Sequence, residues 1–450
     1  MENSRNLKSA DLASRVPRNL KGIVKRGDHL LAGLSGGADS MVLLDVLARA
    51  AKRAGWKLDA MHINHQLSPN AAKWAAHCRR ECRARGVPLT VVKVNVERGN
   101  SVEAAARAAR YAAYRTARAD CIVLAHNQDD QCETLLLRLL RGAGVKGLAA
   151  MPLLRVDEDG QRIARPLLDT PRSAIEAYAR AHRLQWIEDE SNADAYYLRN
   201  FLRRDVLPLI AARAPAYRAT LTRAAAHMGE AAGLLDDLAR IDTTTALVDE
   251  TLTVSALRCL PDARARNLLR YFLASRGVAM PDADKLGEAL RQALGAGGDA
   301  QMRIDLGETE LRRFDGALYL VRKYALPAAA VCVQWRGEKK LPVPALNGVL
   351  EMKVARGGVS GAISRAKLNA AAVTLRARAG GERLRPAAAR PRRSVKNLFQ
   401  ALAIPPWRRE RLPFLWCGDD LVWAPGLGVD CEFQARAGEP AVVPVWRAIE

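Results

Sequence analysis

The sequence lacks several features that would place it in a well-marked class of protein. Its eight cysteines include no C-x-x-C pair, which disfavours a structural zinc site or a disulfide framework. No apolar run approaches the roughly 20 residues of a membrane span, and no lipidation motif is present. The segment from Met1 to Lys25 carries Glu2 and Asp11 and no apolar core, unlike a signal peptide. We therefore expect a cytoplasmic protein without a membrane anchor.

Acidic residues are also scarce. Lys and Arg number 70, whereas Asp and Glu number 48, so the formal net charge is +22. A positive field of this size attracts a polyanion, either a nucleic acid or an anionic membrane. With 49% hydrophobic and 26% charged residues, the composition is otherwise that of an ordinary globular protein.

The chain of 450 residues is too long for one hydrophobic core, and the usual domain size predicts roughly three domains. From Leu30 to about Ala150, short apolar runs alternate with amphipathic stretches, which indicates a parallel sheet with helices on both faces. We predict a doubly wound α/β fold with strands at 30–34, 58–64, 92–96 and 121–125. Ligands bind such sheets beyond the carboxyl ends of the strands.

The remaining domain boundaries follow from local composition and from the positions of prolines and glycines. An Ala-rich stretch predicts a long connecting helix, and a group of prolines after residue 326 suggests a linker. The predicted parts are an N-terminal extension (1–26), a catalytic α/β domain (27–210), the connecting helix (211–247), a small, mostly helical domain (248–325) and a C-terminal α+β domain (345–450). The small domain is expected to end in strands at 311–314 and 318–320. The Ala-rich helices are compatible with a homodimer, but nothing in the sequence specifies its interface.

The most informative segment is Ser35-Gly36-Gly37-Ala38-Asp39-Ser40, between the first apolar run and a helical pattern. Paired glycines let the backbone turn sharply and approach a ligand, and the following helix aims free N–H groups at the turn. These features predict a phosphate site. No Lys follows the glycines, so a Walker A loop is disfavoured. The alternative is a tight strand-to-helix connection in which Asp39 or Ser40 caps the helix.

A second polar segment follows the fourth predicted strand. Asp130 and Glu133 are three residues apart and share a helix face. Acidic residues in a first helical turn also favour the helix dipole, so simple capping explains them equally well. His62, His65 and His126 lie at predicted strand ends, where each could contact a nucleotide or be a packed loop histidine.

Taken together, these motifs resemble those of tRNA(Ile)-lysidine synthetases, a family within the ATP pyrophosphatases. The SGGxDS loop alone indicates only the wider superfamily, whereas the DDQCET segment at 129–134 is much narrower. Matching segments occur in the family's order across nearly the whole chain, at 35–40, 62–68, 103–107, 129–144, 188–192, 199–200, 380–386 and 404–411. Arg408, where the motif has an acid, and Asn127-Gln128 depart from the family pattern.

The resemblance implies an enzyme that joins L-lysine to the wobble cytidine of tRNA(Ile) with a CAU anticodon. ATP would activate the cytidine as an adenylate, and the product would decode AUA instead of AUG. The C-terminal domain would bind tRNA, and ATP and Mg²⁺ would be the cofactors. The implied catalytic residues are Asp39, Asp130 and Glu133, with Asp39 also the metal ligand, because carboxylate oxygens suit Mg²⁺. By the same resemblance, Asp130 and Glu133 match the acidic pair expected to contact the cytidine.

The remaining implied site residues fall into two sets. Those expected to bind ATP are Ser35, Gly36, Gly37, Ala38, Asp39, Ser40 and His62. Those expected to bind tRNA are Arg107, Arg199, Arg203, Arg383, Arg390, Arg392, Arg393 and Lys396. The last five lie in a segment, 376–412, in which eleven basic residues face only Glu382 and Glu410. This imbalance, with Phe399 and Trp407 nearby, favours a phosphate-binding surface over a merely solvated face.

Three rival functions remain open from the sequence. A tRNA thiolase of the same fold would activate the same oxygen, but such enzymes commonly use cysteine pairs. An amidotransferase would need an ammonia source and would not explain the charge of +22. A non-catalytic RNA-binding protein is disfavoured by the complete loop and the intact Asp130/Glu133 pair.

Overall fold

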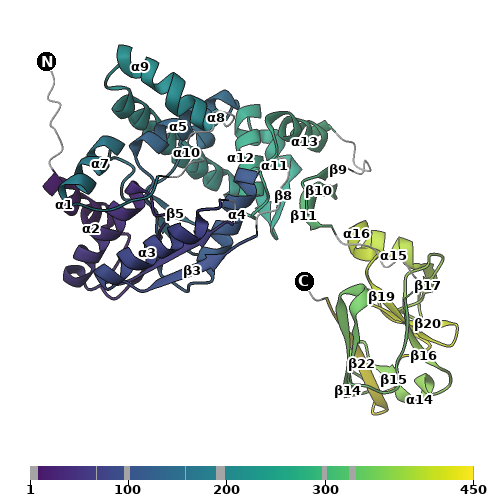
Figure 1. The fold of residues 1–450 in the computed structure, drawn as a ribbon. Helices are drawn as coiled ribbons and strands as arrows, with labels where there is room; N and C mark the ends of the chain where they lie inside the picture. The colour runs from purple at the N-terminus through teal and green to yellow at the C-terminus, as the bar shows by residue number, and fades with distance from the viewer. Residues whose placement is uncertain are drawn as a thin grey trace. The chain divides into compact units, whose positions relative to one another are not determined.

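The computed structural model describes residues 9–66, 68–95, 102–157, 159–188, 198–295, 302–323 and 331–448 (Figure 1). It divides into two compact units, residues 1–240 and 241–450, and each is considered by itself. Some predicted features lie outside the described residues, namely Leu67, Val96, the side chain of Glu103 and the motif residues 189–192.

The first unit is built on a six-stranded sheet, and the predicted doubly wound parallel fold is confirmed. In spatial order the strands are β3 (Leu89–Lys93), β2 (Lys57–Asn64), β1 (His29–Gly33), β4 (Cys121–Val123), β6 (Arg162–Ala164) and β5 (Leu154–Val156). All neighbours are parallel except the edge strand β5. Strand β3 lies earlier than the predicted 92–96, because it pairs with β2 from Ala60↔Leu89 to Asn64↔Lys93 and ends where β2 ends.

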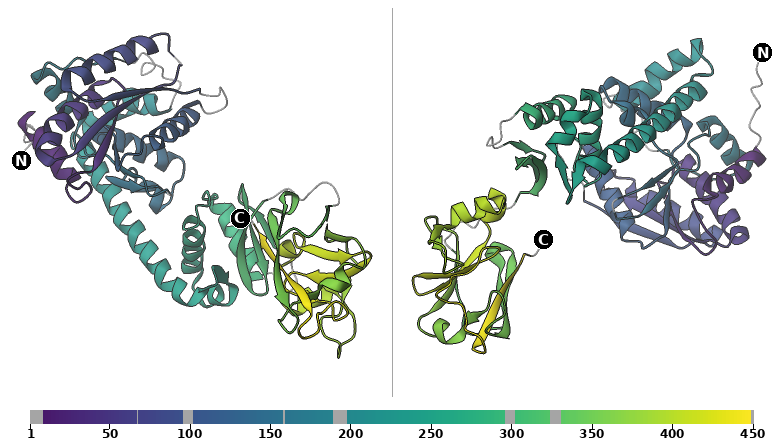
Figure 2. Two further views of the ribbon diagram at one scale, coloured as in Figure 1. Left: turned by 90° about the horizontal axis from the view of Figure 1, so that it is seen from below. Right: turned by 180° about the vertical axis from the view of Figure 1, so that it is seen from behind.

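Helices connect and cover these strands. They are α1 (Ser9–Leu20), α2 (Ala38–Ala54), α3 (Ala71–Arg85), α4 (Val102–Arg115), α5 (Gln128–Leu140), α6 (Val145–Leu148), α7 (Arg172–Ala181), α8 (Leu198–Phe201), the π-helical turn η2 (Leu202–Val206), α9 (Leu207–Arg213) and α10 (Tyr217–Ala246). Helix α10 is continuous and passes the boundary between the two units (Figure 2).

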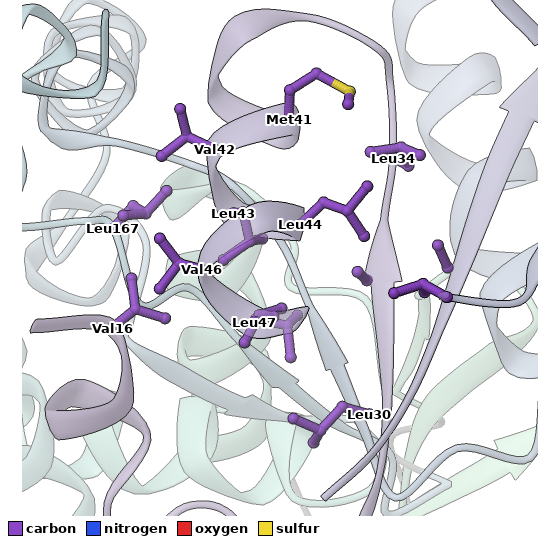
Figure 3. Packing of buried hydrophobic residues seen from close by; sticks show 14 of the residues in the cluster. Val16, Leu30, Leu34, Met41, Val42, Leu43, Leu44, Val46, Leu47 and Leu167 are labelled. Atoms are coloured by element: carbon purple, nitrogen blue, oxygen red, sulfur yellow. The ribbon is translucent and has the colours of Figure 1, made fainter. Parts of the chain in front are cut away.

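The alternation of side chains along the strands produces two cores. On β1, Leu30 and Ala32 face a core shared with α1, α2 and α7 (Figure 3), whereas Leu31 faces a second core that includes Tyr114 of α4. A strand buried on both faces reads as a continuous apolar run, as the sequence of β1 does. The sheet is thus covered on both faces, and its carboxyl edge is left for ligands.

The first helix corrects the predicted N-terminal extension. Leu12, Val16 and Leu20 of α1 are 2%, 0% and 0% exposed and belong to the same core as α2. Because these side chains complete the hydrophobic core, the α/β domain begins before residue 27.

The second unit starts with a small α/β region. It contains α11 (Val254–Cys259), α12 (Asp262–Ala274) and α13 (Ala283–Gly295), with a sheet of β7 (Leu247–Val248), β8 (Thr251–Thr253), β11 (Ala317–Arg322), β10 (Thr309–Phe314) and β9 (Arg303–Asp305) in that order. Strands at Leu311–Phe314 and Leu318–Leu320 were expected and are present. Since it also holds a five-stranded sheet, this region has more strand than the predicted mostly helical domain.

The C-terminal region packs antiparallel sheets against each other. One sheet has the order β12 (Cys332–Gln334), β16 (Val373–Ala377), β19 (Pro413–Cys417), β20 (Asp420–Ala424), β21 (Gly428–Val429). The other has β13 (Lys340–Val343), β14 (Gly348–Arg356), β22 (Pro440–Ala448), β15 (Ile363–Ser364), and β17 (Arg383–Leu384) pairs with β18 (Arg393–Ser394). Between strands lie η3 (Pro344–Leu346) and the short helices α14 (Arg365–Leu368), α15 (Val395–Ala401) and α16 (Pro406–Arg409). This arrangement agrees with the predicted α+β domain.

Candidate active site

The glycine loop joins the carboxyl end of β1 to α2. Gly36 has φ +95°, a conformation that L side chains rarely adopt, and an added Cβ would lie 3.1 Å from Ile187 and 3.3 Å from Cys78. The Ser40 hydroxyl accepts from the Gly36 N–H at 3.1 Å and donates to the Gly37 carbonyl at 2.9 Å. Ala38 and Ser40 are buried in the first turn of α2, while Ser35 is exposed. The loop is therefore held in shape by its own serine and presents the helix N-terminus to a ligand.

Asp39 lies in the first turn of α2 and is electrostatically strained. Its Oδ1 is buried without a hydrogen-bond partner. Burial, with the nearby charge of Asp130, raises the pKa of Asp39 to about 6. A buried carboxylate oxygen that lacks a partner and lies close to a second carboxylate is an arrangement that a cation would stabilise.

Asp130 sits at the start of α5, where both interpretations of the acidic pair apply. Its backbone N–H donates to Asn127 Oδ1 at 3.0 Å and its Oδ2 accepts from the Asn127 N–H at 3.0 Å, which completes a capping box. The other oxygen, Oδ1, lies 3.4 Å from the Arg203 guanidinium. Capping therefore fixes the carboxylate in place, and its second oxygen faces Arg203.

Glu133 is fully buried and is held by two arginines. Arg203 donates to it at 2.6 and 2.9 Å and Arg199 at 3.1 Å. Burial raises the pKa of Glu133, an effect that the two guanidinium charges oppose. Glu133 was predicted to contact the cytidine, but its 0% exposed side chain is occupied by these arginines. Its position suits a residue that orients Arg203 beside Asp130.

The same contacts involve Arg199 and Arg203, whose binding of tRNA remains a prediction. Both lie on the α8–η2 segment, and in this structure both are engaged with the acidic pair. π-Helical turns occur frequently at functional sites. Sequence patterns could not reveal this pairing, since the arginines follow Glu133 by 66 and 70 residues.

The three histidines have different surroundings. His62 is 3% exposed and its Nδ1 donates to the Leu34 carbonyl at 2.9 Å. It therefore holds the backbone of the residue that directly precedes the glycine loop. Burial lowers the pKa of His65 to about 4 and that of His126 to about 3, with the charges of nearby arginines adding to the effect. Both rings are accordingly neutral at pH 7, and the Nδ1 atom of each is buried without a partner.

The donor set fits Mg²⁺ better than a transition metal. Within the described parts of the chain, no group of three or more His, Cys, Asp or Glu side chains is arranged to hold an ion. Mg²⁺ commonly takes only one or two carboxylates and completes its shell with water and substrate phosphates. The unpartnered Oδ1 of Asp39 is suited to such a ligand role.

The predicted basic residues of the C-terminal region are not equivalent. Arg390, Arg393 and Lys396 are exposed, whereas Arg392 lies 3.4 Å from the buried Asp430 and 3.6 Å from Glu432. Arg383 donates to the Arg392 carbonyl at 3.0 Å. Arg392 is therefore at least partly structural.

The two aromatic residues of this segment do not form a stacking surface. Phe399 is buried in the core, and Trp407 packs edge-on against Phe314 and Tyr319, with ring centroids 6.0 and 5.3 Å apart. The expectation that they mark a nucleic-acid surface is wrong for Phe399.

One buried charged residue at the carboxyl edge of the first unit's sheet was not predicted as a site residue. Arg165 directly follows β6 and is only 2% exposed. The signal was available, because Arg165 interrupts an otherwise apolar stretch from Ile163 to Leu168. Arg107 of α4, which was predicted to bind tRNA, is exposed and lies over the ring of Tyr111 at 5.2 Å.

Comparisons with known proteins cover all parts of the chain. A PP-loop domain model matches residues 11–210, a TilS substrate binding domain model 252–319, and a TilS substrate C-terminal domain model 373–446. A tRNA(Ile)-lysidine synthase of Nitrosomonas europaea is 44% identical over 450 residues, covering 99% of this chain and 98% of that protein. Another, of an Azoarcus species, is 43% identical over 424 residues, covering 93% and 91%.

The parallel sheet, the glycine loop after its first strand and the PP-loop match define an ATP-using enzyme of the ATP pyrophosphatase class. Within that class, the full-length similarity shows that the chain belongs to the tRNA(Ile)-lysidine synthase family. None of the helices in the described ranges combines the length and apolarity that a membrane crossing requires.

Proposed function

We propose that this chain ligates L-lysine to the C2 carbon of the wobble cytidine in the CAU anticodon of tRNA(Ile). The observation that carries the proposal is that the glycine loop, Asp39 and the Asp130/Arg203/Glu133 cluster meet at one sheet edge. The similarity to lysidine synthases over the whole chain supports the choice of substrate. The products are lysidine-containing tRNA, AMP and pyrophosphate.

In the first step, the O2 oxygen of the cytidine attacks the α-phosphorus of ATP and pyrophosphate leaves. The N-terminal turn of α2 supplies backbone N–H groups and a positive dipole for the phosphates. Mg²⁺ held by Asp39 would neutralise charge on the departing pyrophosphate. Asp130 carries an oxygen that can accept a hydrogen bond from the exocyclic amine of cytosine.

In the second step, the ε-amine of lysine attacks C2, and O2 departs with AMP. The amine must first lose a proton, and its reference pKa near 10.4 makes this cost roughly 4.6 kcal/mol at pH 7. Arg203, held by Glu133, is placed to stabilise negative charge that develops on the leaving phosphate.

The tRNA would be bound in part by the C-terminal region. Arg383, Arg390, Arg393 and Lys396 are exposed basic residues of the segment that carries few acids. Contacts of this kind supply affinity without reading bases, so they would serve to dock the tRNA while the first unit reads the anticodon.

The test is mass analysis of tRNA(Ile) after incubation with the purified chain, ATP, Mg²⁺ and lysine. We expect the anticodon fragment to gain one lysine with loss of water, and pyrophosphate release to require the CAU anticodon. A tRNA that gains sulfur would support a thiolase instead. Pyrophosphate release that ignores the anticodon would also contradict the proposal, and binding of tRNA without any ATP turnover would support a non-catalytic role.

A further inference from the structure

Two cationic side chains of the first unit meet at one neutral acceptor. Arg107 of α4 and Arg165 after β6 both donate to the hydroxyl of Tyr111, at 3.3 and 3.5 Å. A neutral phenol oxygen is thus the shared acceptor of two guanidinium groups. Among the described side chains, neither arginine forms an ion pair with a carboxylate.

Arg165 is the most constrained member of the group. Its side chain is almost entirely buried, its Nη1 donates to the Pro152 carbonyl at 3.0 Å, and its Nε is buried without a partner. Burial and the charge of Arg107 lower the pKa of Arg165, and the same two causes, with Arg165, lower that of Arg138. Burying a charge without a counterion is costly, so the arrangement is one that an incoming anion would stabilise.

The position of this group ties it to the active site. Arg165 directly follows β6 and His126 follows β4 by three residues, so both lie at the carboxyl edge of the sheet. His126 lies close enough to Arg107, Arg165 and Arg199 to be affected by their charges, and Arg199 also donates to Glu133. The exposed side chain of Arg107 leaves the group open to solvent on one side.

We propose that Arg107, Arg165 and His126 form an oxyanion subsite next to the acidic pair, which binds an anionic group of a substrate. The proposal rests on the proposed function. Apart from the ATP phosphates, which the proposed function assigns to the glycine loop, two substrate groups of that reaction carry a suitable single charge: the α-carboxylate of the amino acid, and a phosphodiester beside the target cytidine. Two guanidinium groups that share one acceptor suit either, because guanidinium binds planar and tetrahedral oxyanions through paired N–H groups.

The test uses Arg107→Gln and Arg165→Gln in the full chain, with Arg53→Gln as the matched control. Arg53 is an exposed arginine in the last turn of α2, at the opposite edge of the sheet. For each protein, kcat/KM is measured with lysine and with cadaverine, which is lysine without its carboxylate. The dissociation constant for tRNA(Ile) is measured separately, without lysine.

If the subsite binds the carboxylate, the preference for lysine over cadaverine falls at least tenfold in both variants and tRNA affinity is unchanged. If it binds a phosphodiester, tRNA affinity falls at least fivefold and the preference is unchanged. Variants that keep both properties of the control protein overturn the proposal. Should Arg165→Gln fail to fold, the exposed Arg107→Gln decides alone, and a wild-type chain that never modifies tRNA refutes the proposed function instead.

Discussion

The proposed metal-ligand role of Asp39 requires an ionised carboxylate, whereas folding favours the protonated form. Its pKa is raised from 3.8 to about 6, so ionising it in the folded chain is unfavourable. A raised carboxyl pKa adds stability that is fully present below pH 3.8 and is lost as the pH rises through about 6. At pH 7.5 the ionised side chain therefore destabilises the fold.

We predict that Asp39→Asn lowers the rate of pyrophosphate release by two or more orders of magnitude. The same substitution should raise the free energy of unfolding of the metal-free protein at pH 7.5 by on the order of 2 kcal/mol. Chemical denaturation followed by a probe in the first unit measures the second effect. The stability difference should vanish near pH 4, where the wild-type carboxyl is protonated. Equal stability of the two proteins at pH 7.5 would contradict the raised pKa.

The residues of the site were partly predictable. Asp39, Asp130 and the paired glycines stand out by type and spacing, because phosphate turns and helix first turns have local signatures. The pairing of Glu133 with Arg199 and Arg203 has no such signature, since it joins residues 66 and 70 positions apart. The sequence therefore predicts Glu133 as a site residue, but not its burial or its two arginine partners.

At the scale of elements, helix α1 is the clearest test of how the first unit is held together. Its three buried residues, Leu12, Val16 and Leu20, are spaced four apart and pack with α2. The spacing is that of a helix face, but Pro17 lies inside the helix and the segment is basic, which favours an extension over a core helix at the level of sequence. Strand β1 and helix α2, by contrast, were predictable because their apolar patterns are continuous.

We predict that Leu20→Ala destabilises the first unit by about 2–4 kcal/mol, because it removes a fully buried side chain and leaves a cavity. The urea midpoint for the first unit measures the effect. Arg18→Ala, at an exposed position of the same helix, should change the free energy of unfolding of the first unit by less than about 0.5 kcal/mol. A Leu20→Ala protein as stable as the Arg18→Ala protein would show that α1 is a dispensable extension after all.

At the scale of the whole molecule, the net charge of +22 correctly indicated a polyanionic partner class but not which residues serve it. Charge counts treat every arginine alike, whereas the structure separates exposed from paired ones. Arg392 neutralises the buried Asp430, and Arg385 lies 2.9 Å from Glu432. An Arg392→Glu substitution would place a second carboxylate beside that of Asp430. Weaker tRNA binding by that variant could then result from unfolding instead of a lost contact.

A sharper test of the docking surface therefore spares Arg392 and changes Arg390 and Arg393 to Glu. Both are exposed, so folding should be unaffected while tRNA affinity falls and the slope of log Kd against log salt decreases by about two. The matched control is Lys353→Glu with Arg356→Glu, which alters the net charge equally at two exposed positions of β14. If the two double variants weaken tRNA binding equally, the effect belongs to the overall field rather than to a local surface. A loss confined to Arg390 and Arg393 assigns phosphate contacts to that surface.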